Sequence, residues 1–254
     1  MIRVGKRKIF ETIKQIFNLN IFPTLIRFFI VHQNPFLSIF NEFFSKGKYP
    51  KFLYLKNKMK IKLYSVFDFS TLNLVFCRGD YYKPSNIKLV LDIGSNIGIT
   101  CLYWIYNNPN CKIFAYEPSS KNYKRLLFNT SKFRKNIICK KLGVSNKNQN
   151  AKLFLSESGV NDSIKKKFRP KYEKIKLVSI NNILKNIFLN NDTLDVLKID
   201  TEGTEKEILE NINKKFFKKI KVINIEGTNY KNIIPDYFSF SIKGSASRFI
   251  NMKF

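Results

Sequence analysis

The chain has 254 residues, 44% of them hydrophobic and 15% aromatic, so it can build a sizeable core, and wholesale disorder is excluded. Lys and Arg number 46 against 18 Asp and Glu, a net charge of +28 that would attract phosphate polymers or anionic lipid. The preference of an AT-rich genome for Lys, Asn, Ile and Phe explains the same charge without a binding role. The single histidine, His32, excludes a histidine-based triad and a multi-histidine metal site.

The cysteines and the N-terminal sequence bear on the compartment. Four cysteines are widely spaced and include no C-x-x-C, which favours free thiols over disulfides or zinc. Glu11 and Lys14 interrupt the apolar start, so no signal peptide is expected. Residues 21–40 contain Pro23, Arg27 and Pro35 and lack the roughly 20 unbroken apolar residues of a membrane span. We therefore expect a cytoplasmic protein.

The first 50 residues predict a helical extension. Apolar residues recur at helical spacing from Ile9 to Phe17, and Pro23 begins a second apolar stretch, so two helices are expected between about Lys6 and Phe44. This extension is either a cap packed on the main domain or a basic amphipathic segment that rests on a membrane surface. The main domain is expected to cover residues 51–254.

Short strands are expected next, at residues 52–55, 59–63 and 72–76. Tyr81 and Tyr82 follow. They are either a lid that binds substrate or packing aromatics.

From residue 89 onward, strand and helix patterns alternate, which predicts an α/β fold. Strands are expected at 89–93, 111–116, 137–141, 151–155, 175–178, 194–199 and 222–225, helices at 99–107, 120–133, 181–188 and 205–212, and a terminal antiparallel pair at 238–242 and 249–254. Such alternation implies a mostly parallel central sheet flanked by helices, with right-handed crossovers.

Residues 89–98 read as a buried strand, a glycine turn and the start of a helix. Asp92 places a carboxylate at the end of the strand, while Gly94 and Gly98 permit a tight turn and a close approach of the backbone to a ligand. The spacing D-x-G-x-x-x-G matches neither the dinucleotide motif nor a P-loop, which bind phosphates. It suits S-adenosylmethionine (SAM), a nucleoside without a pyrophosphate. An ordinary strand-turn-helix corner is the alternative.

Acidic residues stand at the ends of three further strands. Glu117, followed by Pro118, comes about 20 residues after the glycine turn, where a carboxylate can accept hydrogen bonds from both ribose hydroxyls of a nucleoside. Asp200 and Glu202 follow the strand at 194–199, and Glu226 follows the next strand. Glu205 begins a helix, where it would either cap the helix or contact substrate.

These motifs together resemble the FkbM family of methyltransferases. The resemblance rests on residues 90–98, 116–118 and 197–205, and its most specific part is the block K-I-D-T-E-G-T-E. It implies a Rossmann-like class I methyltransferase that uses SAM, with a sugar, glycan or small metabolite as acceptor. The family's functional positions map onto Asp92, Gly94, Asn96, Gly98, Glu117, Asp200, Glu202 and Glu205. We expect the cofactor to be bound by Asp92, Gly94, Ser95, Asn96, Gly98, Glu117, Pro118 and Asp200. Two positions depart from the family pattern: Ser95 replaces the usual alanine, and Asn181 stands where an aspartate is common.

Transfer to a hydroxyl requires a base, because the acceptor must lose its proton. We assign this role to Asp200 and Glu202, acting directly or through a divalent cation such as Mg²⁺ or Ca²⁺, which oxygen ligands suit. Two other functions stay open. The net charge suggests an RNA 2'-O-methyltransferase, and a basic binding module without catalysis would retain the same fold. Base N-methylation is disfavoured, because no Asp-Pro-Pro-Tyr or Asn-Pro-Pro-Tyr follows the strand at 194–199.

Overall fold

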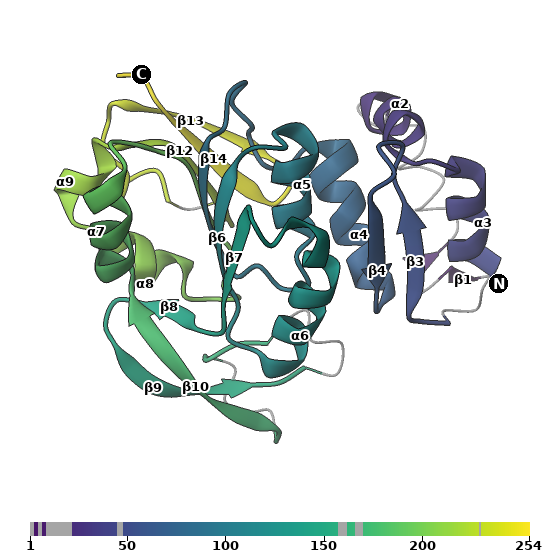
Figure 1. The fold of residues 1–254 in the computed structure, drawn as a ribbon, viewed down its shortest axis with the longest axis horizontal. Helices are drawn as coiled ribbons and strands as arrows, with labels where there is room; N and C mark the ends of the chain where they lie inside the picture. Colours follow the sequence, from purple (N-terminus) through teal and green to yellow (C-terminus); the bar gives the residue numbers. More distant parts are fainter. Residues whose placement is uncertain are drawn as a thin grey trace. The chain divides into compact units, whose positions relative to one another are not determined.

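The computed structural model describes residues 3–4, 7–8, 22–44, 48–156, 162–165, 170–228 and 230–254. Its contacts divide the chain into two compact units, residues 1–79 and 80–254 (Figure 1). This division lies later than the expected boundary between residues 50 and 51, so the short strands expected in the main domain belong to the first unit. The helix expected from Ile9 to Phe17 lies outside the described residues.

The first unit combines helices with a hairpin. It contains β1 (Arg3–Val4), β2 (Arg7–Lys8), α2 (Phe22–Val31), α3 (Pro35–Phe44), β3 (Lys51–Tyr54), β4 (Lys60–Leu63), α4 (Val66–Asn73) and the π-helix η2 (Leu74–Arg78). Strands β3 and β4 pair antiparallel, as do β1 and β2. The only histidine, His32, is buried in this unit and bonds to Ser38 Oγ at 3.2 Å and Asn73 Oδ1 at 3.0 Å. It therefore has a structural role within the first unit.

The strand expected at residues 72–76 was wrong, because this segment is helical. Ser65 caps α4 by accepting the backbone N–H of Asp68 at 3.3 Å, and η2 continues the helix. Leu72, Val75 and Phe76 are buried at helical spacing. A short apolar run has the same appearance in a buried strand and in a buried helix, and here the cap decides between them.

The second unit is built on a seven-stranded sheet. Its strands are β5 (Leu89–Ile93), β6 (Lys112–Tyr116), β7 (Ile137–Lys140), β11 (Leu194–Ile199), β12 (Ile220–Glu226), β13 (Phe238–Lys243) and β14 (Ala246–Asn251), in the order β13-β14-β12-β11-β5-β6-β7. The pairs from β12 to β7 are parallel, whereas β14 runs antiparallel to both neighbours. The expected mostly parallel sheet and terminal antiparallel pair are confirmed.

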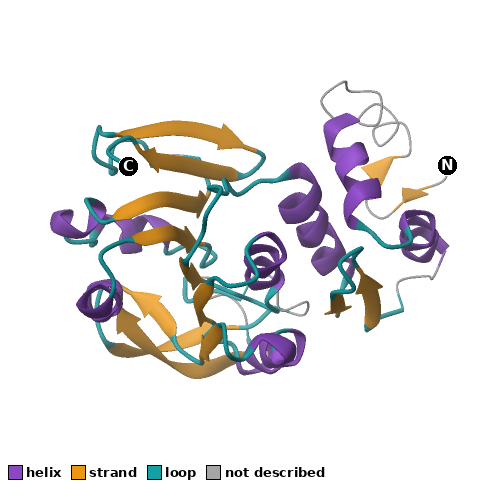
Figure 2. Ribbon diagram, turned by 45° about the horizontal axis from the view of Figure 1, so that its top comes forward, coloured by secondary structure: helices purple, strands orange, loops and turns teal. Residues whose placement is uncertain are grey.

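Helices cover both faces of this sheet (Figure 2). Helices α5 (Ile99–Asn107) and α6 (Ser120–Asn129) lie on one side, and α7 (Ile180–Asn190), α8 (Glu205–Glu210) and α9 (Lys214–Phe217) lie on the other (Figure 1). A 3-10 turn, η3 (Ser131–Phe133), follows α6. The apolar runs of β5 and β11 are completely buried, as strands covered on both faces should be.

A second, three-stranded sheet in this unit has the order β8-β10-β9. Its strands are β8 (Gly143–Ser145), β9 (Gln149–Phe154) and β10 (Tyr172–Ser179). The sequence predicted β9 and β10 but not β8, which pairs parallel to the end of β10. Within the described ranges, no helix has both the length and the apolar character needed to cross a membrane.

The strand order fixes where a ligand can bind. The chain leaves β5 in one direction, toward β6 and β7, and returns to the other side of β5 with β11 and β12. The order therefore reverses between β5 and β11. In open α/β sheets, ligands bind at the carboxyl ends of the strands at such a switch point.

Candidate active site

The register of the sheet brings four predicted residues to one edge. Ile93 lies opposite Tyr116 and Ile199, and Ile199 lies opposite Ile225. The next residue on each strand is Gly94, Glu117, Asp200 or Glu226. These four positions therefore lie in a row at the carboxyl ends of β5, β6, β11 and β12, across the switch point.

The glycine turn can exist only with glycine at its first position. Gly94 has φ +75°, and a Cβ atom there would collide with the backbone oxygen of Asp200. Gly98 has φ +92° at the start of α5, where a Cβ would lie 2.9 Å from a Leu126 methyl group. Asn96 also adopts a positive φ, of 48°. The turn thus holds strained backbone against the end of β11, which is typical of a ligand-binding loop.

Asp92 and Ser95 lie beneath this turn. Asp92 is completely buried and accepts hydrogen bonds from Thr100 Oγ1 at 2.5 Å and from the Cys101 thiol at 3.5 Å. Ser95 is also buried, and its hydroxyl donates to the backbone oxygen of Asp92 at 2.9 Å. Both residues support the turn from inside the fold.

Lys198 is a residue that the sequence analysis did not assign to the site. Its side chain is 1% exposed and lies between Asp92 at 3.3 Å and Asp200 at 3.5 Å. Its ammonium group also donates to the backbone oxygen of Gly94 at 2.6 Å. Burial alone would lower the pKa of Lys198, but the charges of Asp92 and Asp200 outweigh it and raise this pKa above its ordinary value. Lys198 therefore stays charged and ties β5 to β11.

Glu117 is buried at the end of β6 and faces the turn. One carboxylate oxygen accepts the backbone N–H of Asn96 at 2.8 Å, and the other accepts the N–H of Ser119 at 2.9 Å. Burial raises its pKa to about 7, although both N–H groups favour the charged form. Pro118 is half-buried behind it, close to Gly143 of β8.

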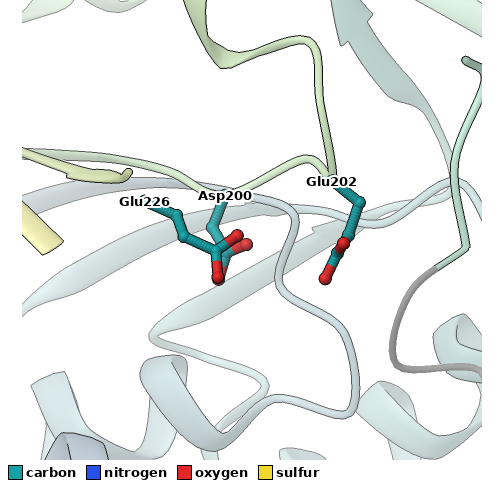
Figure 3. Close-up of side chains that lie close together, drawn as sticks. All are labelled: Asp200, Glu202 and Glu226. Atoms are coloured by element: carbon teal, nitrogen blue, oxygen red, sulfur yellow. The ribbon is translucent and has the colours of Figure 1, made fainter. Parts of the chain in front are cut away.

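Asp200, Glu202 and Glu226 form a carboxylate cluster. Each offers an oxygen, and the three oxygens lie within 4.8 Å of one another (Figure 3). The charge of Asp200 is the first cause, and burial the second, of a rise in the pKa of Glu226 to about 9. Glu202 occupies a strained turn with φ +59°. These carboxylates repel one another, so the cluster favours a cation or a shared proton.

The structure assigns different places to Tyr81 and Tyr82. The buried Tyr81 hydroxyl donates to Asp200 Oδ2 at 3.1 Å, so this ring belongs to the cluster. Burial first, and then the charge of Asp200, hold the pKa of the Tyr81 phenol well above its ordinary value. Tyr82 is held through its backbone, which exchanges two hydrogen bonds with the Asn224 side chain, at 2.7 and 2.9 Å.

Glu205 bonds to the loop that precedes its own helix. It is buried at the start of α8, and one oxygen accepts the N–H and hydroxyl of Thr201 at 2.7 and 3.0 Å. Both oxygens accept the N–H of Gly203 at 3.0 Å. This carboxylate therefore orders the loop before α8 and the start of that helix. Asn181 lies elsewhere, bonded to Asn211 and Asn213.

Together, these groups make a site with two different ends. Glu117 offers acceptors for hydroxyl groups beside the glycine turn, and the carboxylate cluster offers negative charge at the ends of β11 and β12. Ser163, from the segment between β9 and β10, adds a hydrogen bond of 2.6 Å to the backbone oxygen of Glu202. No sequence motif predicted this contact.

A mostly parallel central sheet with this strand order and a terminal antiparallel pair has the Rossmann-like fold of class I methyltransferases. The sequence model of the methyltransferase FkbM domain matches residues 92–241, which is more than half of the chain. The chain therefore belongs to the FkbM methyltransferase family.

Several solved structures are similar to the chain. The FkbM methyltransferase of Methylobacillus flagellatus KT matches 91% of the chain with a TM-score of 0.50 and 15% sequence identity. The chain spans 58% of the length of that protein. TrmK of M. capricolum, solved with S-adenosyl-homocysteine, matches 71% of the chain and 67% of its own at 17% identity and a TM-score of 0.38. A precorrin-6y C5,15-methyltransferase from Geobacter metallireducens GS-15 matches 74% of the chain and 87% of its own at 13% identity and a TM-score of 0.36. No curated protein matches the chain.

Proposed function

We propose that this chain is a SAM-dependent O-methyltransferase whose acceptor is a hydroxyl group of a sugar, a glycan or a small metabolite. The observation that carries the proposal is the row of Gly94, Glu117, Asp200 and Glu226 at the switch point, set by the register of four adjacent strands. Membership of the FkbM family supports the choice of reaction.

The two ends of the site fit the two ends of SAM. Glu117 would accept hydrogen bonds from the ribose hydroxyls in its charged form, beside the Gly94 turn. SAM also carries positive charge on its sulfonium and ammonium groups. The carboxylate cluster of Asp200, Glu202 and Glu226 supplies the opposite charge in a chain that is otherwise strongly basic.

The reaction is an in-line displacement at carbon. The acceptor oxygen forms a bond to the methyl carbon while the bond from that carbon to sulfur breaks, which leaves a neutral thioether. The protein's main contribution is to hold the two reactants in line. The acceptor proton passes to a carboxylate, and Asp200 and Glu202 are the residues we assign to this step. Tyr81 and Lys198 hold one Asp200 oxygen, Oδ2, and so orient the carboxylate.

A divalent cation is the second ligand that the cluster fits. The three half-buried carboxylates offer oxygen atoms within 4.8 Å of one another, which is a donor set for Mg²⁺ or Ca²⁺. Bound there, the ion would lower the pKa of an acceptor hydroxyl and relieve the repulsion at Glu226. Titration calorimetry with Mg²⁺ tests this site, and full methyl transfer after treatment with EDTA would exclude a catalytic role for the ion.

Calorimetric binding of S-adenosyl-homocysteine is the primary test. We expect the wild type to bind it and to transfer a labelled methyl group from SAM to a carbohydrate or metabolite fraction. Asp200→Asn should abolish transfer, and Glu210→Gln, a matched change at an exposed carboxylate of α8, should leave it intact. If the wild type binds neither SAM nor its product, the proposal fails.

The net charge of +28 favours one rival, an RNA 2'-O-methyltransferase. Transfer to RNA that falls steeply as salt rises, with no transfer to carbohydrate, would establish it. The variant Asp92→Ala distinguishes the proposed enzyme from a basic binding module without catalysis. This change should abolish cofactor binding, because it removes the support of the turn, but it would leave a purely electrostatic binder almost unaffected.

A further inference from the structure

The first unit carries an apolar surface on two consecutive helices. Helix α2 exposes residues at the spacing of a single helix face: Phe22, Leu25, Ile26, Phe29 and Ile30. Helix α3 exposes Phe36, Leu37, Ile39 and Phe40, with Phe36 at 75% exposure. We call these nine residues the apolar face. The outer face of a surface helix in a globular protein is normally polar, so an apolar face of this size indicates an interaction site.

The two halves of the apolar face are joined. The rings of Phe29 and Phe36 meet edge to face with centroids 5.3 Å apart, which connects α2 to α3. Leu37 of α3 lines one shallow pocket together with Phe52 and Tyr54 of β3, which are themselves exposed. The surface therefore continues from the helices onto the hairpin without leaving the first unit.

Positive charge borders this surface. Lys60 lies over the Phe52 ring at 3.8 Å from its centroid, and Lys62 lies at 5.7 Å from the same ring. The first 79 residues contain 14 Lys and Arg against three Asp and Glu. Two of the acidic residues lie in described segments, and both are engaged within the unit. Glu42 bonds to Tyr49 and Lys51, and the buried Asp68 accepts the N–H of Tyr64.

We propose that the apolar face docks on the surface of an anionic phospholipid bilayer. A bilayer offers both partners that this surface needs, because negative headgroups lie directly above an apolar layer. The lysines of the hairpin would reach the headgroups while the exposed aromatic and aliphatic side chains enter the acyl boundary. Helices α2 and α3 have ten residues each and would lie in the plane of the membrane. The proposal does not depend on the methyltransferase activity.

Co-sedimentation of the full chain with lipid vesicles tests the proposal. We expect binding to phosphatidylcholine vesicles that contain phosphatidylglycerol, little binding to phosphatidylcholine alone, and weaker binding at high salt. The double variant Phe36→Ser with Phe40→Ser should bind at least about tenfold more weakly, because two large apolar side chains no longer enter the lipid. Lys60→Glu with Lys62→Glu should lose the preference for phosphatidylglycerol.

Matched controls lie in the second unit. Leu189→Ser on α7 removes an apolar side chain that is 71% exposed, and Lys218→Glu reverses an exposed charge. Both variants should bind vesicles like the wild type, and thermal melting should show that all variants fold. The proposal is overturned if the wild type ignores anionic vesicles or if the face variants bind as well as the controls. It is also overturned if light scattering shows a dimer that the face variants dissociate while lipid binding is unchanged, because the apolar face would then join two copies of the chain.

Discussion

The two units of this protein use the same strongly basic composition in opposite ways. The first has three acidic residues, of which the two in described segments serve internal contacts, and it exposes apolar and basic side chains. The second holds the other 15, and four of them, Glu117, Asp200, Glu202 and Glu226, stand at one edge of the sheet. Mutual repulsion and burial raise pKa values there. Carboxylates gathered at one edge of a strongly basic chain therefore favour a ligand that supplies positive charge or hydrogen-bond donors.

The largest loss of stability should come from removing the buried ammonium group of Lys198 in the second unit. Lys198→Met would leave Asp92 and Asp200 without their shared buried partner, and we expect it to lower the free energy of unfolding by about 3–5 kcal/mol. Urea unfolding measures the change. Lys206→Met, at a lysine whose side chain is 67% exposed, should change stability by less than about 0.5 kcal/mol. A loss below about 1 kcal/mol for Lys198→Met would show that this lysine does not hold the two strands together.

The next largest effect should be a loss of affinity for S-adenosyl-homocysteine when the glycine turn is changed. Gly94→Ala forces a Cβ against the backbone oxygen of Asp200 in a residue with φ +75°, and we expect affinity for S-adenosyl-homocysteine to fall on the order of 100-fold. Gly79→Ala is the matched control, because Gly79 has φ +69° at the end of η2, in the first unit. Calorimetry compares the two variants. Equal losses would mean that general backbone strain, rather than the site, limits binding.

In the second unit, the sequence alone predicted the elements that depend on a local pattern of residues. Strands β5 and β11 have the predicted bounds, because each is a mostly apolar segment that ends at a polar turn. Their parallel pairing then brings Asp92, Gly94 and Asp200 to one edge. Strand β8 has only three residues and depends on its pairing with β10, so it left no periodic signal.

Other features could not be predicted, because they depend on contacts between distant residues. The bond between Tyr81 and Asp200 joins positions 119 residues apart. Lys198 in a strand pattern suggests an exposed side chain, and its burial follows only from the two aspartates that neutralise it. The hydrogen bonds from Thr201 and Gly203 to Glu205 form within one loop, and no sequence motif predicted them.

The affinity of the site for S-adenosyl-homocysteine should change about tenfold with pH. Glu117 has a pKa of about 7 in the free protein, and ribose hydroxyls need its charged form as acceptor. We therefore expect the Kd of S-adenosyl-homocysteine to be about tenfold larger at pH 6 than at pH 8. Glu117→Gln should bind weakly at both pH values. A wild-type Kd that does not change with pH would exclude this role for Glu117.

The raised pKa of Glu117 also makes the stability of the protein depend on pH. The pKa of Glu117 is higher in the fold than in the unfolded chain, so its contribution is fully present below pH 4.5 and is lost as the pH rises toward 7. In the absence of ligand, Glu117→Gln should therefore be more stable than the wild type at pH 8, by about 1–3 kcal/mol. Thermal melting at pH 5 and pH 8 measures this difference, which should shrink at the lower pH.

The smallest expected effect is a loss of stability of the first unit on acidification. Its sign is opposite to that of the Glu117 effect on the second unit. Burial lowers the pKa of His32 to about 4, despite its hydrogen bond to Asn73, so its contribution to stability is present above pH 6.5 and is lost as the pH falls toward 4. We expect the first unit to lose about 1–2 kcal/mol between pH 7 and pH 5. Hydrogen exchange measured separately for residues 22–79 and 80–254 would show the first unit loosening on acidification while the Glu117 site tightens. His32→Gln should remove the acid response of the first unit alone, and a common response of both units would contradict the comparison.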